Sequence, residues 1–238
     1  MDASDVLVCA TEHASPITSY PLTIDLAEDF AQRACVPRAL ASLFVNNQLS
    51  GIAIADEIID GIFIGGARAA SADALAARRI TCVINAAREV WMPQIEGVSI
   101  IRLDMADNPA FNPNDAWRRG FNAIVDARKS GQHVLVHCAA GISRSASVVA
   151  AYLMAGHQMT LVDALRLMKS HRPVVSPNIG FLVHLIALER AFYGVTSIPR
   201  RALHLHGGYA AAFYSEDAAD AFISQVVGPV YAAWLAPG

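Results

Sequence analysis

Residues 137–145 place a thiol and a guanidinium at the two ends of a short loop, in the order His-Cys-Ala-Ala-Gly-Ile-Ser-Arg-Ser. The apolar run 134–136 before the loop is typical of a buried strand, and residues 146–154 after it are typical of a buried helix. A strand, a tight loop and a helix together aim backbone N–H groups at an anion. The sequence therefore predicts a phosphate-binding loop in which Cys138 attacks phosphorus.

The loop has to stabilise a negative sulfur. A free thiol with a pKa of about 8.5 is mostly protonated at neutral pH, and only the thiolate is the nucleophile. We expect inward-turned amides and the positive end of the helix dipole near Ser145 to stabilise it, and to bind the phosphate oxygens as well. The residues expected to bind phosphate are Ala139, Ala140, Gly141, Ile142, Ser143 and Arg144.

The other loop residues have distinct expected roles. Gly141 lets the backbone approach closely and tolerates positive φ, and Arg144 grips two phosphate oxygens with its planar fork. The Ser145 hydroxyl donates to the sulfur and makes it a better leaving group. His137 shapes the loop through hydrogen bonds to its backbone, with no role in proton transfer. A buried, inert Cys138 is the alternative interpretation, but it does not explain these neighbours.

A departing alcohol or phenol oxygen needs a proton, which a second residue has to supply. Asp107 is followed by Asn-Pro, a turn signal, so we expect it on a loop that projects toward a cleft. Asp104 lies closer to the preceding strand and is the second candidate, and an ordinary turn carboxylate is the alternative for Asp107.

The nine residues 137–145 resemble the signature of the cysteine-dependent protein tyrosine phosphatases, His-Cys-x5-Arg-Ser/Thr. The residues inside the motif resemble those of the dual-specificity branch, which carries its general acid in an Asp-x4-Asn pattern. Asp107 and Asn112 match this pattern, and Asp107 lies 31 residues before Cys138. Shorter matches at 61–65, 83–87 and 176–178 extend the resemblance over residues 51–193.

The resemblance implies an atypical, compact dual-specificity phosphatase that hydrolyses phosphotyrosine and phosphoserine or phosphothreonine on proteins. It implies a cysteinyl-phosphate intermediate with Cys138 as nucleophile, and Asp107 as acid and then base. No metal and no other cofactor is expected. The match at Ser-Pro-Asn implies that Asn178 supports the loop.

Strand and helix patterns alternate through residues 51–193, which predicts an α/β fold. The expected architecture is a central mixed, mostly parallel sheet flanked by helices. A hairpin is expected at Asp60–Gly61, and helices are expected from Ser71, from Asn112 as a cap, from Thr160 and from Ser176–Pro177. Residues 1–50 are expected to form an extension with short helices, and 194–238 an extension with an amphipathic helix at 215–227.

Composition limits the function classes. The 238 residues are 54% hydrophobic, with a net charge of −3, so nucleic acid is not an expected partner. The expected partner is a phosphorylated protein, with a homodimer through the terminal extensions as a further prediction. No signal peptide and no transmembrane segment is expected. The four cysteines have no metal-ligand spacing, which favours a cytoplasmic location with the nucleus as the alternative.

Three alternatives stay open at this point. Phosphoinositides rank lower because the loop carries no lysine, and RNA 5′-triphosphates rank lower because the chain is acidic. A phosphoprotein-binding module without activity is the rival from another class, although such modules usually lack the nucleophile. Cys82 is expected to be a buried strand residue, with a redox partnership with Cys138 as the alternative.

Overall fold

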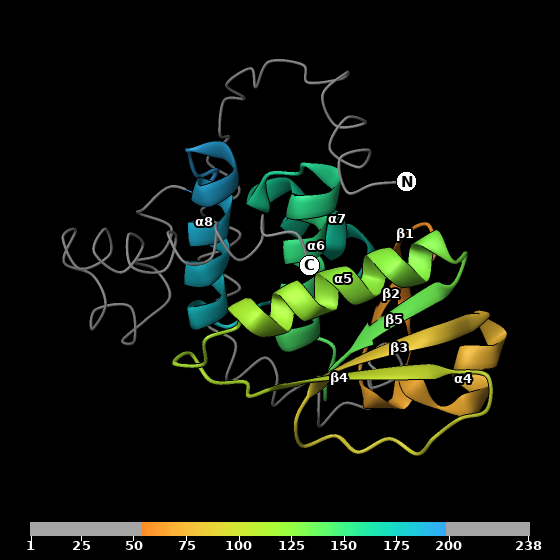
Figure 1. Cartoon of the computed structure of the whole chain (residues 1–238). Coiled ribbons are helices and arrows are strands. Elements are labelled where there is room, and N and C mark those ends of the chain that lie inside the picture. Colours follow the sequence, from red (N-terminus) through yellow and green to blue (C-terminus); the bar gives the residue numbers. More distant parts are fainter. Residues whose placement is uncertain (1–53, 199–238) are drawn as a thin grey trace.

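A five-stranded sheet forms the centre of residues 54–198, the part of the chain that this computed structural model describes (Figure 1). Its strands are β1 (Asp56–Ile59), β2 (Ile62–Gly65), β3 (Ile80–Ala87), β4 (Ser99–Met105) and β5 (His133–His137). They lie in the order β1-β2-β5-β3-β4, with β1 antiparallel to β2 and the other pairs parallel. The predicted mixed, mostly parallel sheet flanked by helices is confirmed.

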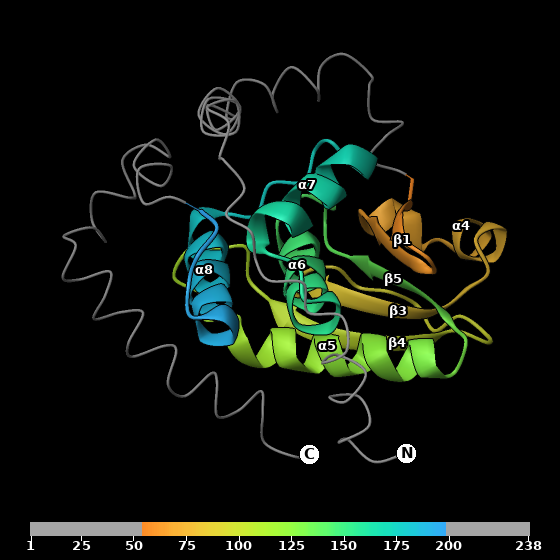
Figure 2. The same ribbon diagram turned by 90° about the horizontal axis from the view of Figure 1, so that it is seen from above.

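Helices cover both faces of the sheet (Figure 2). One face carries α5 (Asn114–Lys129), α6 (Arg144–His157) and α7 (Leu161–His171), with α8 (Ile179–Tyr193) packed against α6. The other face carries the 3-10 helix η2 (Ala67–Ala70) and the short helix α4 (Ala72–Ala77). The phosphate loop therefore leaves a strand that is covered on both sides.

The side chains of β5 alternate between two hydrophobic cores, because successive strand residues point to opposite faces. Val134 and Val136 lie fully buried in the larger core, beneath the helices of the α5 face. Leu135 lies between them and is fully buried in the smaller core with Leu75 of α4. The unbroken apolar run before the loop follows from this burial on both faces.

Predicted element boundaries agree with the structure at some places and differ at others. The hairpin is confirmed, with Gly61 at a φ of +69° between β1 and β2. Asn112 as helix cap is wrong by one residue, because α5 has Pro113 in the cap position and begins at Asn114. The Asn112 side chain still accepts a hydrogen bond from the Asn114 N–H at 3.1 Å.

Several predictions concern residues outside the described part of the chain. The short helices within 1–50 and the amphipathic helix at 215–227 lie there, so they and the domain bounds 51–193 stay predictions. At the C-terminal end of the described part, the buried Glu189 carboxylate accepts hydrogen bonds from Thr196 and Ser197. None of the helices between residues 54 and 198 combines the length and hydropathy that a membrane crossing needs.

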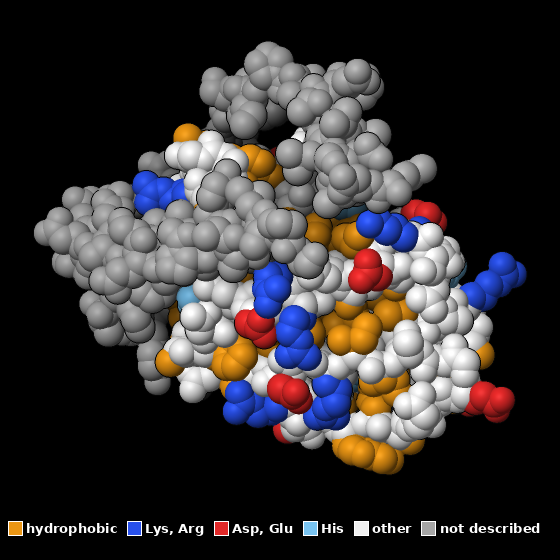
Figure 3. Space-filling view, viewed as in Figure 1, with side chains coloured by type: hydrophobic (Ala, Val, Ile, Leu, Met, Phe, Trp, Pro, Cys, Tyr) orange, Lys and Arg blue, Asp and Glu red, His pale blue; other side chains and the backbone are white. Residues whose placement is uncertain are grey.

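Basic and acidic side chains are interspersed on the face of the molecule that carries α5 (Figure 3). Asp115 of α5 lies 2.9 Å from Arg118 and 3.9 Å from Arg119, and Asp104 of β4 lies 3.4 Å from Arg102. These ion pairs place positive and negative charges next to one another on this face.

Candidate active site

Chemically active side chains gather where the parallel strands end. Gly65 of β2, Asn85 of β3 and His137 of β5 lie side by side in the sheet. Cys138 follows β5 directly, and Asp107 comes shortly after β4. Because the carboxyl ends of parallel strands share one edge, residues far apart in the sequence meet there.

The carbonyl groups of residues 139–142 point out of the phosphate loop (residues 137–145) and accept hydrogen bonds from its surroundings. The pairs are Ala67 N–H with Ala139 O at 3.0 Å, Arg172 Nη2 with Ala140 O at 3.0 Å, Arg172 Nε with Gly141 O at 2.8 Å and Ser176 N–H with Ile142 O at 2.9 Å. In a trans peptide the C=O and the next N–H point in opposite directions. Outward carbonyls therefore turn the amides of the loop inward, as its phosphate-binding role requires.

Gly141 is needed at its position for two reasons. Its φ is +72°, a conformation that other residues rarely adopt. A Cβ there would also lie 2.5 Å from the backbone carbon of Gly65, at the end of β2. The loop therefore packs directly against the neighbouring strand.

The Cys138 sulfur is enclosed by the loop, and the residue is 2% exposed. The Gly141 N–H donates to Sγ at 3.2 Å, and the Ser145 hydroxyl lies 3.3 Å from Sγ. Burial raises the pKa of the thiol, but hydrogen bonds from the Ser145 side chain and from the amides of Ser145, Gly141 and Ile142 outweigh it. The pKa of Cys138 is therefore lower than that of an ordinary thiol.

His137 is fully buried and acts on the loop backbone. Its Nδ1 lies 3.2 Å from the Cys138 carbonyl oxygen and its Nε2 lies 3.0 Å from Met92 Sδ, so the tautomer with the proton on Nδ1 donates to the loop backbone. Burial lowers the pKa of His137, and the hydrogen bond to Cys138 O opposes this shift only in part. The imidazole is neutral near pH 7, which suits the expected shaping role.

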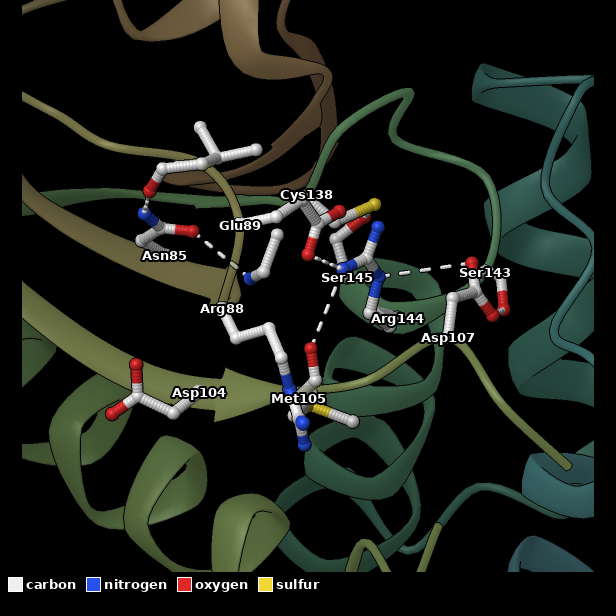
Figure 4. A network of polar contacts seen from close by, with 12 residues as sticks. Asn85, Arg88, Glu89, Asp104, Met105, Asp107, Cys138, Ser143, Arg144 and Ser145 are labelled. Atoms are coloured by element: carbon white, nitrogen blue, oxygen red, sulfur yellow. Dashed lines mark hydrogen bonds and ion pairs between the residues drawn. The ribbon is translucent and has the colours of Figure 1, made fainter. Parts of the chain in front are cut away.

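Arg144 is held at one side of its guanidinium and offers the other side to the site (Figure 4). Its Nη1 donates to Glu89 Oε2 at 2.6 Å and to Met105 O at 3.3 Å. Its Nε is buried, has no hydrogen-bond partner among residues 54–198, and lies 3.7 Å from Asp107 Oδ2. This side of the planar group fits a phosphate oxygen.

Three negative groups keep Arg144 charged. Burial lowers the pKa of Arg144, but the hydrogen bond with Glu89 and the charges of Cys138, Glu89 and Asp107 raise it above its usual value. The guanidinium therefore stays a cation although only 5% of the Arg144 side chain is exposed to solvent. A bound phosphate dianion meets a permanent positive charge here.

Asp107 is fixed by two donors on the same oxygen. Its Oδ1 accepts hydrogen bonds from Ser143 Oγ at 2.7 Å and from Asn178 Nδ2 at 2.8 Å. The other oxygen, Oδ2, faces Arg144, with 3.7 Å between Oδ2 and Arg144 Nε.

Asp104 lies elsewhere. It points away from Cys138 in Figure 4, its side chain is 61% exposed, and it pairs with Arg102 at 3.4 Å. The structure therefore brings the preferred candidate Asp107 to the loop, and not the second candidate.

Asn178 connects the acid with the loop. Its N–H donates to Ser143 Oγ at 3.1 Å, and its Oδ1 caps α8 by accepting the Phe181 N–H at 3.0 Å. The helix expected from Ser176 thus begins three residues later at Ile179, because Asn178 is its cap residue and has an extended backbone. Asn178 thus contacts the loop through Ser143 and, in addition, donates to Asp107.

Ser143 occupies the cap position of α6 without capping it. Its hydroxyl donates to Asp107, so no side-chain hydrogen bond closes the first turn of the helix. The first N–H groups of a helix have no partner within it. At α6 these amides stay available for phosphate oxygens, together with the positive end of the helix dipole.

Glu89 is a site residue that the sequence analysis did not identify. It follows β3, and Asn85 shapes the turn before it by donating to Val90 O at 2.7 Å and accepting from the Ala87 N–H at 2.9 Å. Its position in the sequence could have identified Glu89, because a carboxylate directly after a buried parallel strand lies at the same edge of the sheet as Cys138.

Cys82 is a buried residue of β3, as expected. It pairs in register with Val134, four residues before Cys138 along β5. At roughly 3.3 Å per residue, the two cysteines are too far apart for a disulfide. Burial raises the pKa of Cys82, and a hydrogen bond with Ser99 opposes this only in part. Cys82 is therefore an inert thiol.

The chain is similar to known proteins. The family model of the dual specificity phosphatase catalytic domain matches residues 62–191. Human dual specificity protein phosphatase 14 is 37% identical over 170 residues, covering 68% of this chain and 82% of that protein. Human dual specificity protein phosphatase 26 is 38% identical over 144 residues, covering 57% of this chain and 67% of that protein.

Solved structures agree. Human DUSP28 superimposes with a TM-score of 0.56 at 35% identity, covering 58% of this chain and 94% of that one. The human tyrosine phosphatase-like serine/threonine/tyrosine-interacting protein has a TM-score of 0.54 at 31% identity, covering 59% of this chain and 98% of that one. The nucleophile loop, the family match and these relatives lead to one conclusion: the chain belongs to the dual specificity phosphatases and is a protein phosphatase.

Proposed function

We propose that this phosphatase works in two steps, with Cys138 as nucleophile. In the first step the Cys138 thiolate forms a bond to phosphorus while the bond from phosphorus to the substrate oxygen breaks, and Asp107 Oδ2 gives its proton to that oxygen. In the second step Asp107 takes a proton from a water molecule, which displaces the sulfur. Ser145 donates to the departing thiolate.

The single observation that carries this proposal is the set of amide and hydroxyl donors on the Cys138 sulfur. They stabilise the thiolate before substrate arrives and match the charge that develops on the phosphate oxygens. Arg144 adds a fixed cation beside the same place. These groups of the protein thus neutralise the negative charge of the phosphate.

Dual specificity phosphatases act on phosphorylated proteins. Both phosphotyrosine and phosphoserine or phosphothreonine are proposed as substrates of this chain. Four loop residues between Cys138 and Arg144 bear uncharged side chains, so the loop supplies no extra cation for the additional phosphates of an inositol lipid: Ala139, Ala140, Ile142 and Ser143. A panel of phosphopeptides, phosphoinositides and triphosphate RNA compares these classes directly.

The proposed location is the cytoplasm, with the nucleus as the alternative. A thiolate nucleophile is oxidised easily and needs a reducing compartment. Imaging of the tagged full chain tests this. A homodimer through the terminal extensions stays a proposal that light scattering of the full chain tests, with a monomer as the contradicting result.

Replacement of the nucleophile tests the mechanism. Cys138→Ser should lower the turnover of an aryl phosphate by at least about 10³-fold, since the covalent route is lost, and should still bind phosphopeptide. Cys82→Ala removes the other described thiol and should keep normal turnover. Substantial turnover by Cys138→Ser contradicts the proposal, and binding without turnover by the unmodified chain favours the rival binding module.

A further inference from the structure

Arg172 is a buried cation outside the predicted site. It follows α7, is 1% exposed, and donates from Nη1 to Asp56 Oδ2 of β1 at 2.6 Å. A buried guanidinium is costly unless its donors are satisfied. Two of its other nitrogens bind carbonyl groups of the phosphate loop.

These two bonds fix two successive peptide units. Arg172 Nε donates to Gly141 O at 2.8 Å, and Nη2 donates to Ala140 O at 3.0 Å. The N–H groups on the far side of the same peptide units belong to Gly141 and Ile142. The Gly141 N–H donates to the Cys138 sulfur at 3.2 Å, and both N–H groups lower the pKa of its thiol.

We propose that Arg172 is a positioning residue: by holding the carbonyls of Ala140 and Gly141 outside the loop, it keeps the amides of Gly141 and Ile142 on the Cys138 sulfur. It acts through the backbone of the loop. The planar fork of arginine suits this task, because its nitrogens diverge at fixed angles toward two carbonyls and a carboxylate. This inference deepens the proposed role of Cys138 as a thiolate.

The experiment measures the Cys138 thiol without any substrate. The rate of alkylation of Cys138 by iodoacetamide is followed against pH by mass spectrometry of its peptide, in the full chain. Arg172→Gln should raise the thiol pKa by about one unit, which means about tenfold less thiolate below that pKa. Arg166→Gln removes an exposed arginine of α7 that pairs with Asp163, and should leave the alkylation profile unchanged.

Arg172→Lys separates positioning from charge. Lysine keeps the cation but holds the two carbonyls poorly, so the proposal expects a raised thiol pKa in this variant too. An Arg172→Lys profile equal to that of the parent overturns the proposal, whether or not Arg172→Gln folds. A raised thiol pKa in folded Arg172→Lys, with native circular dichroism, supports it.

Asp56→Asn controls for a general loss of stability. It removes the carboxylate partner of Arg172 but leaves the bonds to the loop carbonyls. It should lower the unfolding free energy and leave the thiol pKa near that of the parent. If Asp56→Asn raises the thiol pKa as much as Arg172→Gln does, the effect belongs to stability and the proposal fails. Because alkylation needs no turnover, this result is independent of the proposed phosphatase mechanism.

Discussion

The phosphate loop (residues 137–145) and the acid segment (residues 106–113) reach the same site but are built differently. The phosphate loop is mostly buried, and its carbonyls are bound from outside by backbone donors and by Arg172. The acid segment has no regular secondary structure, and most of its residues are exposed. The two halves of one active site therefore differ in how firmly the fold holds them.

Besides the packing of Phe111 on the core, the acid segment is held at few points. Asp107 is tied to Ser143 and Asn178 by side-chain hydrogen bonds. Pro109 lies with its backbone directly over Gly180 of α8, where a Cβ would collide with it. Segments with few buried contacts open at low free energy. Damage to the acid segment should therefore cost turnover with little stability, whereas damage to the phosphate loop should cost both.

Asp107→Asn tests this contrast with the largest expected effect. Amide and carboxyl have the same shape, so the hydrogen bond network persists while the transferable proton is lost. Turnover of an alkyl phosphate substrate should fall by about 10²- to 10⁴-fold, with unchanged melting temperature and unchanged alkylation of Cys138. Asp104→Asn is the control, because Asp104 points away from the site, and should keep normal turnover. If Asp104→Asn loses turnover and Asp107→Asn keeps it, Asp104 is the general acid.

Gly180→Ala should displace the acid segment without altering a chemical group. The added methyl group meets the Pro109 backbone, so Asp107 moves and turnover should fall by roughly 10²-fold, as small misplacements of catalytic groups do. Gly156→Ala in α6 is the matched control, because its Cβ meets Phe121 at an ordinary 3.5 Å. Alanine at position 156 should keep turnover and stabilise the helix by up to about 1 kcal/mol. Equal turnover in both variants contradicts the tether at Pro109.

The contrast between the two regions also explains which parts of the site could be predicted from the sequence. The nucleophile, the loop glycine and the arginine lie within nine consecutive residues, so local spacing was enough to predict the loop between strand and helix. The acid was predicted from a turn signal and the family pattern. The burial of β5 was predicted from its unbroken apolar run, because a strand covered on both faces is apolar throughout.

The supporting residues were not visible in the sequence. Glu89 and Arg172 contact the loop only after β3 is paired with β5 and α7 is packed against α6 and β1. Asn178 was predicted to support the loop, but its hydrogen bond to Asp107 spans 71 positions. Such long-range side-chain contacts depend on the strand order, which sequence periodicity does not determine.

Glu89→Gln should have a smaller effect, on phosphate binding. The charged partner of Arg144 Nη1 is lost, so the guanidinium is held less firmly and the KM for an aryl phosphate should rise by about tenfold at most. Glu96→Gln removes an equal charge from the segment between β3 and β4 and is the control. An unchanged KM in Glu89→Gln contradicts the role of Glu89 in holding Arg144.

The pair also predicts a pH dependence. The hydrogen bond from Arg144 is the largest cause that lowers the pKa of Glu89 below its ordinary value of 4.5. A carboxylate with a lowered pKa contributes stability above its unfolded-state pKa and loses it as the pH falls through the folded-state value. The difference in unfolding free energy between the parent and Glu89→Gln should therefore be constant above pH 4.5 and shrink at lower pH. Chemical denaturation at several pH values measures it.

Ser147→Ala has the smallest expected effect on turnover and tests whether the two regions are separable. Trp117 of α5, the helix after the acid segment, donates from Nε1 to Ser147 Oγ of α6 at 3.1 Å, and both residues are fully buried. The substitution leaves the indole N–H unsatisfied, so the unfolding free energy should fall by about 1–3 kcal/mol. Because this bond lies in the core below both regions, turnover of the folded enzyme should change little.

Ser170→Ala, at an exposed serine of α7, is the matched control and should keep the unfolding free energy of the parent. A large loss of turnover at parental stability in Ser147→Ala would instead show that the helices transmit changes from the acid segment to the phosphate loop, and the contrast between a rigid and a lightly held half would fail.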